Sequence, residues 1–258
     1  LFSSINLFGL ALAMSVCMLI MLMMADQKNY DRFHEKKDRT YRILSQRQGS
    51  SKPNASSPFP LSGTLKTEYP MVEETTTLTL GVGGDATYKQ RTVQMRGYFA
   101  DPSFFNVFSY ELEKGNKARA LELPNSLVIT SEFSRLLFKD ENPVGKTIEF
   151  TDRGLGIINR IGKESPPVHW GAYTIAGVIA DKDYKSHLKF DVLVSSASMK
   201  PLHDQQKIKD ISQDWATYSK NFTYIVLAPE KSAHDLTVAL NDIAAREYNN
   251  IEHLKGFR

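Results

Sequence analysis

The residue patterns that could bind a nucleotide or a catalytic metal occur in this chain only as fragments. Gly145-Lys146-Thr147 resembles the end of a phosphate-binding loop, but that motif needs a glycine at position 140, where Asp140 stands. His34-Glu35 begins like the zinc motif HExxH, yet position 38 is Asp38. Gly81-Val82-Gly83-Gly84 is flanked by threonine-rich, strand-like segments with no helix after it, so it is predicted to be a hairpin turn. The sequence therefore predicts neither a nucleotide site nor a metal site at these positions.

Other catalytic residue types are present without a supporting pattern. No GxSxG segment occurs, and the single cysteine, Cys17, lies in an apolar stretch, so a disulfide, a cysteine nucleophile and a cysteine-based zinc site are excluded. Asp181, Asp183 and Asp191 lie near the ends of predicted strands, where two could pair as acid and base, although surface acids are common there. We assign no catalytic, cofactor-binding or metal-binding residue and expect no enzyme. The functions that remain open are binding, sensing and force transmission.

Several aromatic residues have two interpretations. Phe104, Phe105 and Phe108 follow Asp101-Pro102 on a short predicted helix, where they can pack in a core or form a ligand platform; core packing is the prediction. Trp170 and Trp215 lie near irregular segments, where exposure would indicate a partner surface.

The first residues of the chain are predicted to cross a membrane. Residues 1–25 contain no charged side chain, and about 20 apolar residues suffice to span the hydrocarbon core as a helix. A signal peptide would need a basic start and a small-residue cleavage site, and a buried helix would rarely run so long without a charge. The chain begins at Leu1 without an initiator Met, so we expect it to be a fragment. Its net charge of +3 is too small and too evenly spread to indicate a nucleic acid partner.

Orientation does not follow from the local charge. Basic residues at positions 28, 32, 36, 37, 39 and 42 follow the helix, and the positive-inside rule taken alone would place them in the cytoplasm. Large domains are translocated largely regardless of flanking charge.

The order of the remaining elements predicts an α+β fold. Alternating and helical patterns give a strand, a helix and a strand, then a long middle region, then a strand and a helix. This order fits a split βαβ unit with a mostly β insertion over residues 97–216. The principal predicted strands cover residues 40–45, 72–81, 86–96, 125–130, 148–150, 173–180, 190–195 and 222–228, and the helices cover residues 61–69, 132–138, part of 199–220, and 232–248.

Five segments, in order, resemble the MacB/FtsX-like permeases of bacterial ABC transporters, in the form common among Bacteroidetes. They are the apolar helix with NYDRFH (29–34) and DRTYR (38–42), ADPSFF (100–105) with Phe108, PNSLVIT (124–130), NPVGKTI (142–148), and YTIAGVIA (173–180) with SHLKFD (186–191).

This resemblance implies a first transmembrane helix (1–27), a stalk (28–39) and a periplasmic domain of two lobes. A Porter-like lobe would comprise residues 40–96 and 217–258, and a Sabre-like lobe would be inserted at 97–216. The resemblance also implies a bacterial inner-membrane location with the main domain in the periplasm, three further membrane helices after Arg258, a second permease copy and a periplasmic or outer-membrane partner. ATP chemistry would belong to a cytoplasmic ATP-binding subunit, and the function would be export or mechanotransmission.

On this basis Tyr30, Asp31, Arg32, Phe33 and His34 form the candidate coupling junction between helix and domain, with a passive stalk as the alternative. Two other functions stay open. A ligand-sensing ectodomain of a membrane-anchored signalling receptor would share the single helix and the binding-type domain. A membrane-anchored hydrolase would require a cluster of perturbed acids or histidines in one cleft.

Overall fold

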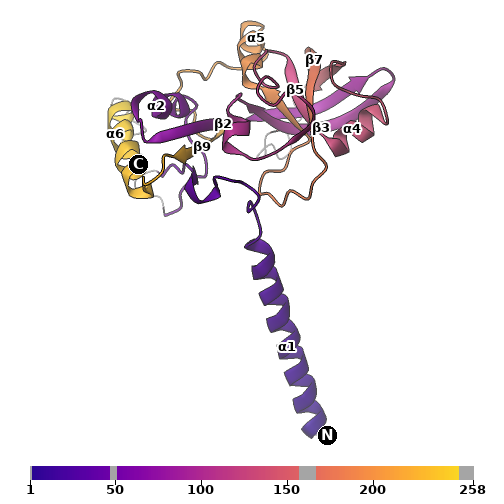
Figure 1. Ribbon diagram of the computed structural model, residues 1–258, viewed down its shortest axis with the longest axis vertical. Helices are drawn as coiled ribbons and strands as arrows, with labels where there is room; N and C mark the ends of the chain where they lie inside the picture. Colours follow the sequence, from indigo (N-terminus) through magenta and orange to yellow (C-terminus); the bar gives the residue numbers. More distant parts are fainter. Residues whose placement is uncertain (1, 47–50, 157–166, 250–258) are drawn as a thin grey trace.

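A computed structural model describes residues 2–46, 51–156 and 167–249. Helix α1 (Phe2–Gln27) projects away from a compact mixed body (Figure 1). Its most apolar window has a mean hydropathy of 2.5, and none of that window is buried against the rest of the protein. By length and composition α1 is therefore a candidate membrane span, as predicted.

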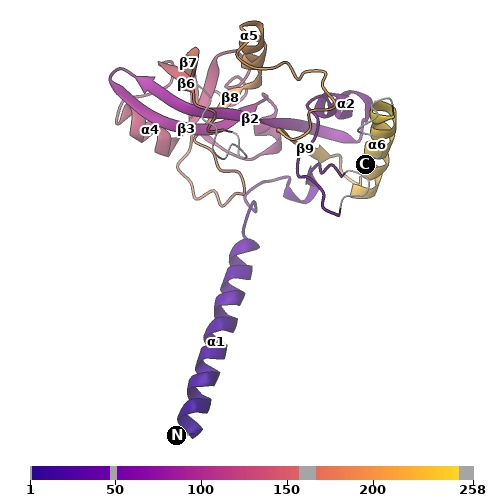
Figure 2. The same cartoon turned by 180° about the vertical axis from the view of Figure 1, so that it is seen from behind.

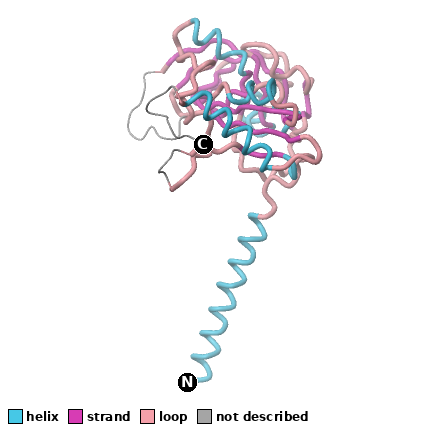
Figure 3. The backbone as a smooth tube through the Cα atoms, turned by 90° about the vertical axis from the view of Figure 1, so that its left-hand side faces the viewer, coloured by secondary structure: helices cyan, strands magenta, loops and turns pink. Residues whose placement is uncertain are grey.

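One sheet runs through the body, in the order β1-β9-β2-β3-β8-β5-β7-β4, with β6 paired to both β2 and β7. The views in Figures 1 and 2 show it from opposite sides, and Figure 3 shows the helices distributed around it. The strands are β1 (Thr40–Arg42), β2 (Val72–Tyr88), β3 (Arg91–Ala100), β4 (Leu112–Gly115), β5 (Ser126–Thr130), β6 (Thr147–Asp152), β7 (Val168–Ile179), β8 (Val192–Ser195) and β9 (Asn221–Leu227). The helices after α1 are α2 (Leu61–Glu68), α3 (Phe104–Val107), α4 (Ser131–Phe138), α5 (Met199–Asp204) and α6 (Ala233–Tyr248), with short 3-10 turns at Lys37–Arg39 and Ser196–Ser198.

The predicted split βαβ unit is present at one end of the sheet. β9 lies between β1 and β2 and is antiparallel to both, so β1 and β2 are parallel and are joined through α2. Leu65 of α2, Ile225 of β9 and Ile243 of α6 meet in one apolar cluster. A capping box formed by Ser232 and Asp235 starts α6. The lobe boundaries at residues 97 and 216 stay a prediction.

The predicted turn at Gly81–Gly84 is wrong. β2 continues through these glycines to Tyr88, and the hairpin turns at Lys89 instead, which has a φ of 53°. A Cβ on Gly84 would lie 2.0 Å from the carbonyl oxygen of Thr151, and one on Gly83 would lie 2.1 Å from the nitrogen of Gly156. The glycines therefore serve close approach of neighbouring backbone rather than chain reversal.

Two further apolar clusters fill the middle of the body. One packs α4 against β3, β5 and β7, and the other surrounds α3. Phe104, Phe105 and Phe108 are buried in the second, which confirms core packing. Trp170 is also buried, stacked on Phe99 with 5.5 Å between ring centroids, so it offers no exposed partner surface. Of the predicted irregular segment 153–167, residues 157–166 lie outside the described residues.

Candidate functional site

The chain between α1 and the sheet is held by hydrogen bonds from its first turn onward. Backbone N–H groups of Lys28, Asn29 and Tyr30 donate back to the end of α1, so the helix passes into tight turns without a free linker. Asp31 follows with a φ of 59°, a left-handed conformation that Asp tolerates better than most residues. Its N–H donates to the carbonyl oxygen of Lys185 at 2.7 Å. The helix is therefore tied directly to the loop between β7 and β8.

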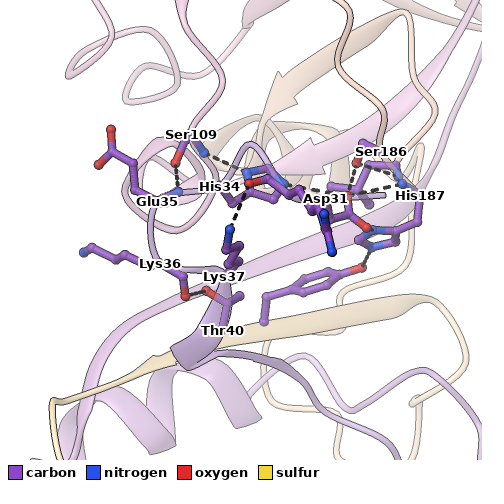
Figure 4. Close-up of polar contacts among 12 residues, drawn as sticks. Asp31, His34, Glu35, Lys36, Lys37, Thr40, Ser109, Ser186 and His187 are labelled. Atoms are coloured by element: carbon purple, nitrogen blue, oxygen red, sulfur yellow. Dashed lines mark hydrogen bonds and ion pairs between the residues drawn. The ribbon is translucent and has the colours of Figure 1, made fainter. Parts of the chain in front are cut away.

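The carboxylate of Asp31 is the centre of this contact (Figure 4). Oδ1 accepts a hydrogen bond from Oγ of Ser186 at 2.6 Å, and Oδ2 lies 2.6 Å from Nδ1 of His187. Because an ionised carboxylate only accepts, Nδ1 carries the proton. Nε2 of His187 lies 2.7 Å from the hydroxyl of Tyr224 on β9. The chain Asp31–His187–Tyr224 thus links the helix end to the centre of the split βαβ unit.

Electrostatics favours the charged form of Asp31. Burial alone would raise its pKa, but hydrogen bonds from Ser186 and His187, with the attraction of His187, hold the pKa below its usual value. A second ion pair joins the same two segments, between Asp26 at the end of α1 and Lys185.

His34 is buried beside this contact and is held neutral. The backbone N–H of Ser109 donates to its Nδ1 at 3.0 Å, so the ring proton belongs on Nε2, which lies 3.7 Å from Oδ1 of Asp31. Burial lowers the pKa of His34 to about 4, against the opposing attraction of Asp31. The N–H of Glu35 donates to Oγ of Ser109 at 2.9 Å, which closes a two-way link to the connection between α3 and β4.

The five candidate residues divide into two groups. Asp31, Phe33 and His34 contact the domain, with the Phe33 ring 4.8 Å from that of Tyr184 and 5.2 Å from that of Tyr110. Tyr30 and Arg32 are exposed.

A third contact fixes the following turn. Lys36 and Arg39 both bind the carboxylate of Glu73 on β2, at 2.7 Å and 2.6 Å, and these bonds lower the pKa of Glu73 to about 2. Residues 31–39 therefore contact the β7–β8 loop, the α3–β4 connection and β2 in succession. We call this segment with its three partners the junction.

The chemistry of the junction is that of a fixed contact. Both ring nitrogens of His187 are occupied, and Oγ of Ser186 donates to a carboxylate rather than to a histidine base, so the geometry of an activated serine is not met. Over residues 2–46, 51–156 and 167–249, no three His, Cys, Asp or Glu side chains are grouped as metal ligands.

The other sequence fragments have local structural roles. Pro143–Lys146 forms a turn, with the N–H of Lys146 donating to the carbonyl oxygen of Pro143. Asp181 pairs with Arg135 at 2.7 Å, and Asp191 accepts from the N–H of Arg96 at 2.8 Å, so these two acids bind separate partners.

Several residues that make these contacts escaped the sequence-based assignment, among them Lys36, Arg39 and Glu73. Ser186 and His187 belong to a segment that carried the family resemblance, but nothing in their spacing shows that they meet Asp31. Tyr224 lies in a strand that was predicted and Ser109 lies in a loop, but nothing in the sequence indicates the contacts that either residue makes. Pairing the NYDRFH and SHLKFD segments would have found Ser186 and His187.

Solved structures of other proteins share this architecture. A search of curated proteins finds no match. Among solved structures, a domain of a putative permease from Porphyromonas gingivalis superposes with a TM-score of 0.64 at 20% identity, covering 88% of this chain and 89% of that one. The periplasmic region of MacB from Actinobacillus actinomycetemcomitans gives 0.53 at 13% identity, with coverage of 85% and 87%.

The extracellular domain of the noncanonic ABC-type transporter YknZ from Gram-positive bacteria gives a TM-score of 0.52 at 14% identity, with coverage of 84% and 98%. At these identities the likeness shows a shared fold. The family described as MacB-like periplasmic core domain matches residues 3–243, which is most of the sequence. The chain therefore belongs to the family of MacB-like periplasmic core domains, which are parts of ABC transporter permeases.

Proposed function

We propose that this chain couples a cytoplasmic ATPase to export or mechanotransmission in the periplasm, with α1 spanning the bacterial inner membrane. α1 and the domain move as one body because the junction binds them together. The observation that carries the proposal is the Asp31 carboxylate, whose hydrogen bonds to Ser186 and His187 begin four residues after α1 ends. A passive stalk would not need three separate contacts within residues 31–39.

The proposal extends to the assembly. The ATP-binding partner is a cytoplasmic subunit, the permease works as a pair of copies, and a periplasmic or outer-membrane protein receives the movement. The lipid bilayer surrounds α1, whose side chains are exposed along its length. Within the domain, residues 40–96 with 217–258 and residues 97–216 are two lobes. β2 pairs with β9 and also with β3 and β6, so this one strand connects the two lobes mechanically.

The test is to express the permease with its ATP-binding subunit, isolate inner membranes, and ask which parts are accessible. Protease added to the periplasmic side should cleave the domain but leave the ATP-binding subunit intact, and the two should co-purify after detergent extraction. Cleavage only from the cytoplasmic side would contradict the orientation. Absence of the subunit from the purified permease would contradict the partnership.

A further inference from the structure

Two basic side chains are left without a partner where α1 meets the domain. Lys28 and Arg32 are exposed, and neither side chain forms a hydrogen bond or an ion pair with any residue in the described part of the chain. The backbone carbonyl oxygen of Arg32 accepts from Nζ of Lys37 at 3.5 Å, which leaves the guanidinium itself unused. Tyr30 lies between the two in sequence and is 40% exposed. These three side chains are therefore available to a partner outside the domain.

Three other basic residues that follow α1 are bound within the protein. Lys36 and Arg39 share the carboxylate of Glu73 on β2. Arg42 of β1 donates from Nε to the carbonyl oxygen of Ala55 at 3.0 Å. These basic residues further along the chain thus serve the fold, whereas the two nearest the helix do not.

The acids nearest the end of α1 are neutralised by the domain. Asp26 forms an ion pair with Lys185, and Asp31 is bound by the same loop between β7 and β8. Glu35 and Asp38 are exposed, but they stand eight and eleven positions after the end of α1, where the chain has already joined the domain. The positive charge at the helix end is therefore not cancelled by the acids beside it.

The β7–β8 loop adds no net charge to this side of the domain. The loop lies on the side of the domain to which α1 is attached (Figures 1 and 2). Residues 180–191 contain three lysines and three aspartates. Lys182 is paired with Glu111, as Lys185 is with Asp26. The uncompensated charge nearest α1 is therefore that of the two basic residues at the helix end.

The position of Lys28 matches the headgroup layer of a bilayer that α1 spans. The stretch without charged side chains ends at Ala25, and a helix rises about 1.5 Å per residue, so Lys28 lies about 4.5 Å beyond that stretch. The polar layer on each side of the hydrocarbon core is about 5–7 Å thick. The N–H groups of residues 28–30 donate back to the end of α1, and these tight turns keep Arg32 close to the helix end. Both cations therefore lie near the level of the lipid phosphates.

Unpaired cations at this level favour an anionic partner in the bilayer itself. A guanidinium can bind two phosphate oxygens at once, an ammonium binds phosphate as a point charge, and tyrosine is enriched at the membrane interface. We propose that Lys28 and Arg32 bind the phosphate groups of anionic phospholipids in the leaflet that faces the domain, with Tyr30 in the headgroup layer.

This inference rests on the proposed function, because it requires α1 to span the membrane. It adds a second attachment to the bilayer beside the helix. Since Asp31 fixes the helix end to the β7–β8 loop, lipids bound at Lys28 and Arg32 also hold the domain at one height above the membrane.

The test places the full chain in nanodiscs of phosphatidylcholine with a minor share of phosphatidylglycerol. Electron paramagnetic resonance of spin-labelled lipids measures how strongly the protein prefers phosphatidylglycerol over phosphatidylcholine. Lys28→Gln combined with Arg32→Gln removes both charges at exposed positions. Lys139→Gln combined with Lys220→Gln removes the same charge from exposed lysines elsewhere on the domain and is the matched control. At low ionic strength the preference should fall about tenfold in the first variant and stay unchanged in the control.

Three results overturn the proposal while the membrane span stands. They are an inserted native chain without lipid preference, a preference that the Lys28 and Arg32 substitutions leave intact, and an equal loss in the control. Displacement of the lipid by millimolar glycerol phosphate would overturn the choice of a lipid over a soluble phosphate. Failure of the native chain to enter the nanodisc would instead contradict the membrane span, and with it both proposals. Insertion and lipid preference are separate readouts, so the two failures are distinguishable.

Discussion

Nδ1 of His187 lies 2.6 Å from Oδ2 of Asp31, although 156 positions separate the two residues in the sequence. Asp31 stands just after the candidate membrane helix, and His187 lies in the loop between β7 and β8. With Ser186 on the other oxygen, the contact makes the end of the helix part of the domain.

The Asp31 carboxylate should contribute measurably to stability. Asp31→Asn keeps a side chain that tolerates the left-handed backbone but removes the charge, so it should lower the free energy of unfolding by about 1–3 kcal/mol. Asp31→Ala adds backbone strain and should cost more. Urea unfolding of the full chain in detergent measures both, with exposed Arg32→Ala as the control. Equal stability of Asp31→Asn and the native protein would show that the charged contact of Asp31 does not stabilise the fold.

His34 makes stability fall on acidification. Its pKa is about 4 in the folded protein and about 6.5 unfolded, so between these pH values the unfolded chain binds more protons. The contribution of His34 to the free energy of unfolding is fully present above pH 6.5. It is lost as the pH falls toward 4, by on the order of 3 kcal/mol. His34→Gln can still accept from Ser109 and should flatten this part of the stability–pH profile.

The quantity to compare is the difference in the free energy of unfolding between the native protein and His34→Gln at each pH. Because Asp31 and Glu73 titrate in both proteins, their losses cancel in the difference. A constant difference from pH 7 to pH 4 would show that His34 is not held neutral.

α1 should fail to insert when a charge is placed at its centre. Leu19→Arg costs about 2.5–3.5 kcal/mol on insertion scales and should shift the protein out of the membrane fraction. Leu136→Arg changes an equally accessible leucine on α4 and should have no such effect. Undiminished membrane fractionation of Leu19→Arg would count against a membrane span.

Replacing a glycine of β2 by alanine should change stability in the opposite direction to replacing an exposed helical glycine. At Gly84 a Cβ would meet the carbonyl oxygen of Thr151 at 2.0 Å, so Gly84→Ala should cost about 1–3 kcal/mol or more. At Gly63 in α2 nothing lies within 4 Å, and Gly63→Ala should stabilise by up to about 1 kcal/mol. Thermal unfolding distinguishes the two, and a neutral Gly84→Ala would show that the strands separate easily there.

Local patterns predicted most elements, because periodicity and turn residues are local properties. The helix predicted at residues 132–138, the split βαβ order and the buried phenylalanines follow from such signals. The glycines at 81–84 misled because a turn and a close backbone approach both need glycine, and only the partner strand distinguishes them. His187 and Tyr224 were missed for a related reason: their role depends on tertiary distance. Asp31 and His34 were chosen as candidates through the resemblance rather than through a chemical pattern.

The most direct test of the account measures whether α1 and the domain move together. Spin labels at Cys17, exposed on α1, and at Lys231→Cys, exposed on the domain, report the distance between them in the permease assembled with its ATP-binding subunit. We expect a narrow distance distribution that is the same without nucleotide and with ATP bound, and a broadened one in Asp31→Ala. A distribution in the native junction that is broad, or that changes on ATP binding, would contradict the coupling of helix and domain.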